Sequence, residues 1–275
     1  MDIPFIQLND GQRIPQLGLG TWKTADADAA DLVLTALRLG YRHIDTAAIY
    51  GNERGIGEGL ARAGVPRGEL YITTKLWNDR QGYDETLKAF DESLQRLGLD
   101  YVDLYLIHWP CPERNRFLDS WKAMLRLREE GRIQSVGVSN FREEEIEAVI
   151  METGVVPAVN QIEVHPWLQQ RALRELGTYK GIATEAWSPL AQGGELLADP
   201  VVRDLAAKHG KTPAQVILRW HVQQGSIIFP KSSNPARIEE NAAIFDFQLD
   251  EADLQRIAGL ERGQRLGPDP ATFNG

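Results

Sequence analysis

The sequence predicts an α/β chain that folds as a (β/α)₈ barrel (TIM barrel), with a β-hairpin at its N-terminus and two helices beyond the eight that a barrel needs. Three observations support this prediction. Eight short apolar runs alternate with amphipathic stretches, 275 residues is a usual length for one such barrel, and every apolar run ends in a polar or aromatic residue. We therefore expect residues 1–275 to form a single domain.

The N-terminal hairpin is predicted from a turn between two apolar segments. Phe5, Ile6 and Leu8 precede the turn residues NDG (9–11), and Ile14 follows them. A turn containing Asp-Gly between apolar residues is typical of a hairpin.

The eight predicted barrel strands are continuous apolar runs. Such runs are typical of parallel strands that are buried on both faces, and helical patterns between them indicate βαβ units. The strands are expected at QLGLGT (16–21), HIDTA (43–47), YITTKL (71–76), VDLYLIH (102–108), SVGVSN (135–140), AVNQIEV (158–164), ATEAWSPL (183–190) and SIIFPKS (226–232).

The helices are predicted from periodicity and capping residues. Residues 117–130 place their apolar side chains on one helical face, and residues 212–222 begin with a capping Thr212 and with Pro213 in the first turn. The two additional helices are expected near 199–209 and 250–260.

A doubly wound sheet is the rival fold, and it requires a glycine-rich dinucleotide fingerprint directly after an early strand. The nearest segment, GIGEGL (55–60), has the wrong spacing and follows Tyr50-Gly51-Asn52 instead of a strand. The sequence therefore favours the barrel.

Composition limits the classes of function. The net charge of −9 argues against a nucleic-acid partner, and no apolar run reaches the 18 residues that a membrane span requires. Cys111 is the one cysteine and the N-terminus does not resemble a signal peptide, which together favour the cytoplasm.

Polar residues at the strand ends are the main functional signal, because catalysis in barrels takes place at the carboxyl ends of the strands. Asp45 and Lys75 end neighbouring predicted strands, so we expect an ion pair, which is better evidence for pKa control than for stability. His108 ends the next strand. The full set of strand ends is Thr21-Trp22, Asp45, Lys75, His108, Ser139-Asn140, Gln161-Glu163, Trp187-Ser188 and Lys231-Ser232.

Tyr50 lies five residues after Asp45 and is the predicted general acid. A tyrosine ordinarily titrates near pH 10, and a nearby ammonium such as that of Lys75 lowers the pKa. Tyr50 would then protonate a carbonyl oxygen that His108 binds by a hydrogen bond, while hydride adds to the carbon.

The segment 229–241 predicts an anion site. Lys231 lies in a loop, Asn234 can cap a helix that Pro235 begins, and Arg237 is in the first turn of that helix. Helix N-termini with basic side chains suit a phosphate. The five histidines form no HExxH pattern, and neither GxSxG nor a Walker A sequence is present, so we predict no metal site.

With these residues in view, the chain resembles the aldo-keto reductases over nearly its whole length, and within them most closely the short bacterial 2,5-diketo-D-gluconate reductases. The matching segments are GLGTW (18–22), HIDTAAIYGNERGIG (43–57), TTKLW (73–77), DLYLIHWP (103–110), GVSNF (137–141), VNQIEVHP (159–166), WSPLAQG (187–193), HGKTPAQ (209–215) and FPKSSNPARIEEN (229–241).

The resemblance implies NADPH-dependent reduction of aldehydes or ketones to alcohols, with substrates that include diketo sugar acids such as 2,5-diketo-D-gluconate or methylglyoxal-like dicarbonyls, and it implies a monomer. The implied catalytic residues are Asp45, Tyr50, Lys75 and His108. The implied NADPH/NADP⁺ ligands are Ser139, Asn140, Gln161, Trp187, Ser188, Leu190, Lys231, Ser232, Arg237, Glu240 and Asn241. The implied substrate contacts are Trp22, Ile49, Trp77, His108 and Trp109.

Three departures from the family pattern concern the substrate pocket. Trp22 stands where many relatives have Phe or Tyr, which reshapes the pocket. The segment after Pro110 is short, so we expect that side to be open. The tail, residues 261–275, has few bulky side chains besides Phe273, so we expect it not to close over the substrate.

Two other functions are alternatives to that of a reductase. A barrel that binds dinucleotide as a regulatory subunit would more naturally have an altered set of the four catalytic residues or an added interaction segment. An unrelated barrel such as a phosphate-binding isomerase does not explain the eight polar strand ends.

Overall fold

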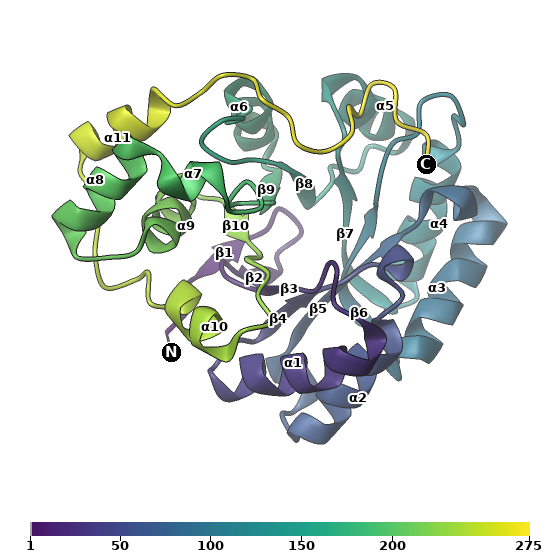
Figure 1. Cartoon of the computed structure of the whole chain (residues 1–275). Coiled ribbons are helices and arrows are strands. Elements are labelled where there is room, and N and C mark those ends of the chain that lie inside the picture. Colours follow the sequence, from purple (N-terminus) through teal and green to yellow (C-terminus); the bar gives the residue numbers. More distant parts are fainter. Residues whose placement is uncertain (1) are drawn as a thin grey trace.

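The computed structural model describes residues 2–275 and begins with the predicted hairpin (Figure 1). Strands β1 (Phe5–Gln7) and β2 (Arg13–Pro15) pair antiparallel, with Ile6 opposite Ile14. Leu8 and Ile14 pack with Tyr71, Leu104 and Phe229 in one buried cluster. The hairpin thus closes one end of the sheet, and the opposite end remains for the functional site.

Eight parallel strands follow in the order β10-β9-β8-β7-β6-β5-β4-β3. A parallel bridge between Leu17 and Ile228, with a hydrogen bond of 2.9 Å from the Gly18 amide to the Ile228 carbonyl, joins the first strand to the last. The predicted (β/α)₈ barrel is confirmed. The strands are β3 (Leu19–Gly20), β4 (His43–Asp45), β5 (Tyr71–Leu76), β6 (Val102–Ile107), β7 (Ile133–Ser139), β8 (Val159–Glu163), β9 (Ala183–Trp187) and β10 (Ile227–Ile228).

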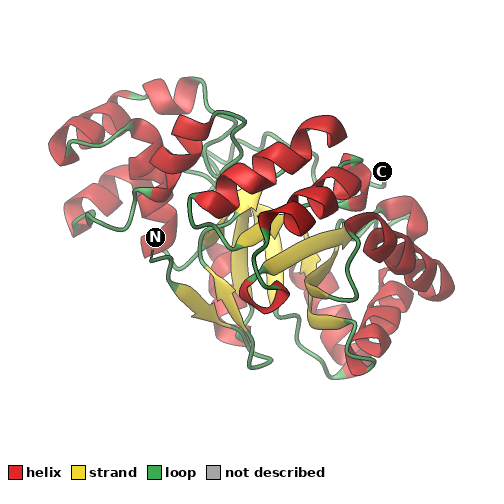
Figure 2. Ribbon diagram, turned by 90° about the horizontal axis from the view of Figure 1, so that it is seen from below, coloured by secondary structure: helices red, strands yellow, loops and turns green. Residues whose placement is uncertain are grey.

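Helices surround this sheet, as Figure 2 shows. The two additional helices predicted near 199–209 and 250–260 are present as α8 and α11, and a short helix, α7, was not predicted. The helices are α1 (Asp26–Arg38), α2 (Glu53–Ala63), α3 (Tyr83–Leu97), α4 (Phe117–Glu129), α5 (Glu143–Thr153), α6 (Arg171–Lys180), α7 (Glu195–Ala198), α8 (Pro200–His209), α9 (Pro213–Gln223), α10 (Pro235–Ala242) and α11 (Glu251–Ala258).

Several strand boundaries differ from the prediction for local reasons. The first and last strands shorten to two residues each, where they meet: a Cβ on Gly20 would lie 2.7 Å from the Phe229 carbonyl oxygen, so the backbones are almost in contact. Strand β9 ends at Trp187, because Ser188 has a left-handed φ of 49° and Pro189 has no amide hydrogen to donate. Strand β7 begins at Ile133, two residues earlier than predicted.

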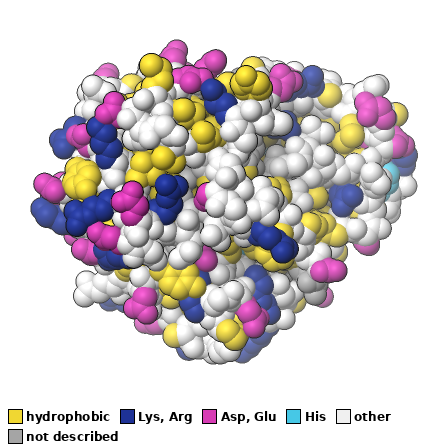
Figure 3. Space-filling model, turned by 180° about the vertical axis from the view of Figure 1, so that it is seen from behind, with side chains coloured by type: hydrophobic (Ala, Val, Ile, Leu, Met, Phe, Trp, Pro, Cys, Tyr) yellow, Lys and Arg dark blue, Asp and Glu magenta, His cyan; other side chains and the backbone are white. Residues whose placement is uncertain are grey.

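The surface carries charges of both signs. On the face shown in Figure 3, basic and acidic side chains are interspersed. Within residues 2–275, no helix has the length and apolar character that crossing a membrane requires.

Candidate active site

A buried ion pair forms the floor of the barrel mouth, the end of the barrel at which the strands finish. The Lys75 ammonium on β5 donates to Asp45 Oδ1 on β4 at 2.7 Å and to the Thr46 carbonyl at 2.9 Å. The Lys75 side chain is fully buried. Burying two charges costs free energy that their attraction roughly offsets, so the pair indicates a functional constraint more than a stabilising one.

Tyr50 and His108 lie directly beside this pair. Tyr50 ends a 3₁₀ turn (Ala48–Tyr50) that Gly51 terminates with a φ of 67°. Its ring centroid is 5.2 Å from the Lys75 ammonium and 5.8 Å from the centroid of the His108 ring. The structure therefore brings the four predicted catalytic side chains into one cluster.

Asn52 fixes the loop that carries Tyr50, and the sequence analysis did not identify it. The Thr46 hydroxyl donates to Asn52 Oδ1 at 2.7 Å, and Asn52 Nδ2 donates to the carbonyls of Thr21 and Thr24 at 2.9 and 3.2 Å. One buried amide thus ties the Tyr50 loop to the ends of β3 and β4. A lone Asn after a glycine carries no such signal in a sequence.

The charge states of the cluster follow from burial and from the ion pair. Burial and the Lys75 charge hold the pKa of His108 well below its usual value, so its imidazole is neutral. Burial lowers the pKa of Lys75, but the charges of Asp45 and Tyr50 outweigh it and the net pKa is raised.

The pKa of Tyr50 differs from the expectation. Burial raises its pKa, and Lys75 lowers it without overcoming burial. The expected direction of the Lys75 effect is correct, whereas the expectation of a lowered net pKa for Tyr50 is wrong in the protein alone.

The ends of β7 and β9 hold an indole in place. Trp187 Nε1 donates to Asn140 Oδ1 at 2.8 Å, and Asn140 Nδ2 donates to the His108 carbonyl at 3.0 Å. Asn140 has a φ of 61°, a left-handed conformation that Asn tolerates better than most residues. The Ser139 hydroxyl donates to the Gln161 carbonyl at 2.8 Å. Four of the predicted cofactor residues therefore form one hydrogen-bonded group beside His108.

A further carboxyl lies beneath Gln161, and the sequence analysis did not single it out. Gln161 Nε2 donates to Asp45 Oδ2 at 2.9 Å and to Glu185 Oε2 at 2.8 Å. Glu185 on β9 is fully buried. An acidic residue inside an otherwise apolar strand is visible in the sequence, so this signal could have identified Glu185.

Aromatic and apolar side chains line the mouth. Trp77 lies with its ring centroid 5.2 Å from that of His108, and Trp109 lies 6.4 Å from Trp187. Trp22 and Ile49 are 43% and 47% exposed, which is unusual for large apolar side chains and suits a surface that receives a ligand.

The C-terminal tail covers one side of the mouth, contrary to expectation. In Figure 1 it runs in yellow from α11 over the top of the view to the C-terminus beside α4 and α5. The Phe273 ring packs 4.6 Å from the Trp109 ring. Asn274 accepts from the Glu113 amide at 2.9 Å and from Arg114 at 2.8 Å. The tail and the segment after Pro110 therefore close the side that we expected to be open.

Glu163 anchors the start of this tail. Its buried carboxylate accepts from the Leu266 amide at 2.6 Å and from the Gly267 amide at 3.1 Å. A Cβ on Gly267 would lie 2.4 Å from the Trp187 ring, so only glycine permits this approach. These contacts are invisible in the sequence because they join segments about 100 residues apart.

The predicted anion loop has the expected helix start. Asn234 Oδ1 accepts from the Ala236 amide at 2.9 Å, and α10 begins at Pro235. Lys231 and Arg237 are exposed. Farther along α10, Asn241 is buried, and Glu240 accepts a 2.7 Å hydrogen bond from the Thr212 hydroxyl. Ser232 is buried beside the loop, and Leu190 lies beyond β9.

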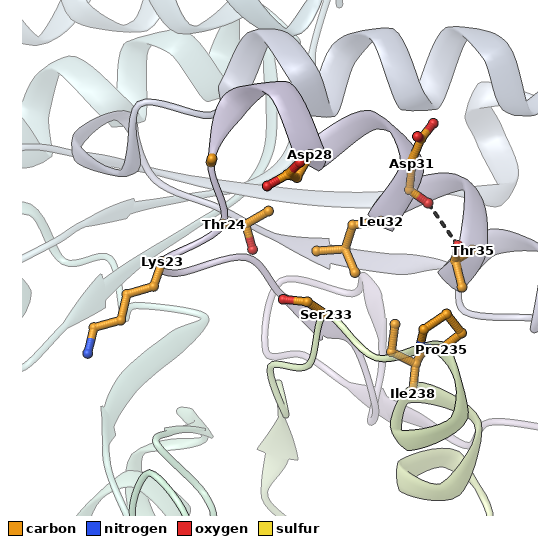
Figure 4. Close-up of a pocket in the computed structure, with 10 residues that line it drawn as sticks. Lys23, Thr24, Asp28, Asp31, Leu32, Thr35, Ser233, Pro235 and Ile238 are labelled. Carbon is orange, nitrogen blue, oxygen red and sulfur yellow. Dashed lines mark hydrogen bonds between the residues drawn. The ribbon is translucent and has the colours of Figure 1, made fainter.

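A cleft of about 340 Å³ lies between α1 and this loop (Figure 4). Its lining includes Lys23, Thr24 and Ser233 together with the carboxylates of Asp28 and Asp31. Because two carboxylates repel an anion, this cleft is poorly suited to a phosphate. Among residues 2–275 no group of His, Cys, Asp or Glu side chains has the arrangement of a metal site.

Comparison with known proteins identifies the family. Residues 16–262 match the model of the Aldo/keto reductase family. An aldo-keto reductase of Mycolicibacterium smegmatis is 60% identical over 271 residues, which are 98% of each chain. Methylglyoxal reductase DkgA of Escherichia coli K12 is 50% identical over 271 residues, again 98% of each chain. The chain therefore belongs to the aldo/keto reductase family.

Solved structures agree with this assignment. Apo Gox0644 superposes with a TM-score of 0.94 at 48% identity, with 98% of each chain covered. A mutant of Gox0644 in complex with NADPH gives 0.95 at 47% identity, with 99% of each chain covered. The predicted class, an NADP-dependent oxidoreductase that acts on carbonyl groups, is confirmed.

The contact between Phe273 and Trp109 can be tested without knowing the substrate. We predict that Phe273→Ala increases amide hydrogen exchange in residues 268–275 about fivefold to tenfold, because an aromatic pair and part of a buried ring are lost, together worth about 1–1.5 kcal/mol. Mass spectrometry of exchanged peptides measures this. Tyr179→Ala, on the exposed face of α6, is the matched control. Unchanged exchange in the tail of Phe273→Ala would show that the ring does not anchor it.

Proposed function

We propose that the protein reduces aldehydes and ketones, among them small dicarbonyl compounds of the methylglyoxal type, with NADPH as reductant and Tyr50 as general acid. The observation that carries this proposal is the cluster in which Tyr50 and neutral His108 flank the buried pair of Lys75 and Asp45. Family membership supports the reaction class.

NADPH, when bound, supplies the hydride that adds to the carbonyl carbon. His108 is neutral and can donate a hydrogen bond to the carbonyl oxygen, which orients the substrate. Tyr50 gives its proton to that oxygen, so the C=O bond becomes an alcohol. The ammonium of Lys75 stabilises the phenolate that remains, and Asp45 keeps the ammonium charged and fixed. The phenolate then takes a proton from water.

The residues around the mouth fit the cofactor. Trp187 offers an indole held by Asn140, against which a nicotinamide ring can stack, and Gln161 and Ser139 lie beside it. Ser188 and Leu190, which follow β9, would contact the diphosphate. Lys231, Ser232 and Arg237 at the start of α10 suit the 2′-phosphate of the adenosine, with Glu240 and Asn241 nearer the adenine.

The walls of the mouth support this substrate class. Trp22, Ile49, Trp77 and Trp109 are apolar, and the Phe273 ring packs against Trp109 and narrows one side. The Escherichia coli relative that is 50% identical carries the name methylglyoxal reductase. Both observations support small dicarbonyls as substrates. A comparison of kcat/KM for methylglyoxal and for 2,5-diketo-D-gluconate distinguishes small dicarbonyls from diketo sugar acids.

We also propose that the enzyme is a monomer of the cytoplasm. The four catalytic side chains come from one chain, and the chain has a single cysteine. Sedimentation of the purified protein tests the first statement.

Tyr50→Phe tests the role of the general acid. We predict that kcat falls 10²-fold to 10⁴-fold, since this is the usual contribution of a positioned acid, while the Kd of NADPH changes less than twofold. Stopped-flow turnover and quenching of tryptophan fluorescence measure the two quantities. Wild-type turnover in Tyr50→Phe would refute the mechanism.

The double variant Lys231→Ala/Arg237→Ala tests the phosphate site. Because charge-assisted hydrogen bonds contribute about 1.5–3 kcal/mol each, we predict that kcat/KM with NADPH falls at least tenfold whereas kcat/KM with NADH is almost unchanged. Lys211→Ala, which removes a half-buried cation paired with the exposed Asp246, is the control. Equal losses with both cofactors would place the 2′-phosphate elsewhere.

A further inference from the structure

Glu185 is a fully buried carboxyl inside the barrel, and the mechanism above does not use it. It lies on β9 in register with Gln161 on β8. Its Oε2 accepts from Gln161 at 2.8 Å, and its Oε1 has no hydrogen-bond partner among the described residues. A buried polar side chain without an evident structural partner on one oxygen calls for a functional explanation.

The side-chain amide of Gln161 connects two acids. One of its two hydrogens goes to Asp45 Oδ2 at 2.9 Å and the other to Glu185 Oε2. Both donor positions are therefore occupied, and Gln161 Oε1 makes no hydrogen bond to any described residue. An amide held in this way presents only its acceptor to a ligand.

Without Glu185 only one hydrogen of this amide has an acceptor, so its orientation is less well defined. Asp45 alone satisfies one hydrogen, and rotation about the last torsion of Gln161 is otherwise almost free. The second acceptor, on β9, fixes the plane of the amide from the opposite side.

The charged and titratable groups that face Glu185 lie on two other strands. They are Asp45 on β4, Lys75 on β5 and the phenol of Tyr71 on β5. Burial raises the pKa of Glu185 to about 8, and the Asp45 charge adds to this, while Gln161 and Lys75 oppose it. At neutral pH Glu185 is therefore protonated, beside the ion pair of Lys75 and Asp45.

We propose that Glu185 is a positioning residue for the cofactor: its carboxyl orients the Gln161 amide so that Oε1 accepts a hydrogen bond from the carboxamide NH₂ of the nicotinamide. This inference rests on the proposed function, since it requires that Gln161 binds NADPH.

The position of Glu185 also couples its proton to the redox state of the cofactor. Above pH 8 Glu185 ionises and adds a second anion near Asp45, next to the Gln161 amide that would bind the nicotinamide. Oxidised nicotinamide carries a positive charge and reduced nicotinamide does not, so the ionised form favours NADP⁺ over NADPH. The pKa values of Tyr50 and Lys75 are raised and that of His108 is lowered, so these three groups keep their charge between pH 7 and 9.5.

The experiment compares Glu185→Met, which keeps the length of the side chain but accepts poorly, with Glu185→Gln, which keeps a neutral acceptor. Thr184→Val, on the opposite face of β9, is the control for general effects on this strand. The Kd values of NADPH and NADP⁺ are measured by tryptophan fluorescence at pH 7.0 and 9.5, and the melting temperature of each apo variant is recorded.

We expect Glu185→Met to weaken NADPH binding at pH 7.0 about tenfold, the loss of roughly one well-formed hydrogen bond, and Glu185→Gln to stay within about twofold of wild type. In the wild type, the ratio of the Kd of NADPH to that of NADP⁺ should rise about threefold to tenfold from pH 7.0 to 9.5, and in Glu185→Gln it should stay constant.

NADPH binding by Glu185→Met within twofold of wild type overturns the inference, as does a pH-dependent ratio that persists in Glu185→Gln. If Glu185→Met does not fold, Glu185→Gln alone decides, because a purely structural residue would not change the pH dependence of the ratio. If wild-type protein does not bind NADPH, the proposed function itself is wrong, which separates the two failures.

Discussion

The ion pair of Lys75 and Asp45 is the constraint on which the rest of the site depends. Two charges are removed from water in the floor of the mouth, at a free-energy cost that their 2.7 Å contact only roughly offsets. Each member of the pair makes a further hydrogen bond: Lys75 also donates to the Thr46 carbonyl, and Asp45 also accepts from Gln161. Burial first and the charge of Lys75 second shift the pKa values of Tyr50 and His108. A hydrophobic replacement of the pair would serve stability equally well but would leave Tyr50 without a cation beside it.

The barrel supplies the geometry that the pair requires. Parallel strands end at one rim, so residues far apart in the chain meet without long loops. Asn52 holds the Tyr50 loop against this rim, and Asn140 holds Trp187 on its far side. Glu163 performs a similar task for the tail, whose Phe273 completes the wall of Trp109. Each of these residues is a buried polar side chain that satisfies backbone groups or side chains of a segment distant in sequence.

The sequence was sufficient for the fold and for the membership of the cluster, because both depend on local patterns. Apolar runs identified all eight strands, and polar residues at their ends identified Asp45, Lys75 and His108. What it did not predict depends on contacts between distant segments. The tail looked too short to cover the mouth, yet Glu163 and Gly267 lead it across Trp187. Glu185 looked like one residue of an apolar strand. The net pKa of Tyr50 was misjudged because burial, which a sequence does not show, exceeds the effect of Lys75.

The central claim is that the cation at Lys75 makes Tyr50 a usable acid, and one variant tests it most directly. Lys75→Met/Asp45→Asn removes both charges together, so no unpaired buried charge remains and the protein should fold, as circular dichroism would show. We measure kcat with a saturating small aldehyde and saturating NADPH. A fall of at least about 100-fold with NADPH binding retained is the result expected here. Turnover within a few-fold of wild type in the folded double variant would contradict the claim, because Tyr50 would then act without the charge beside it.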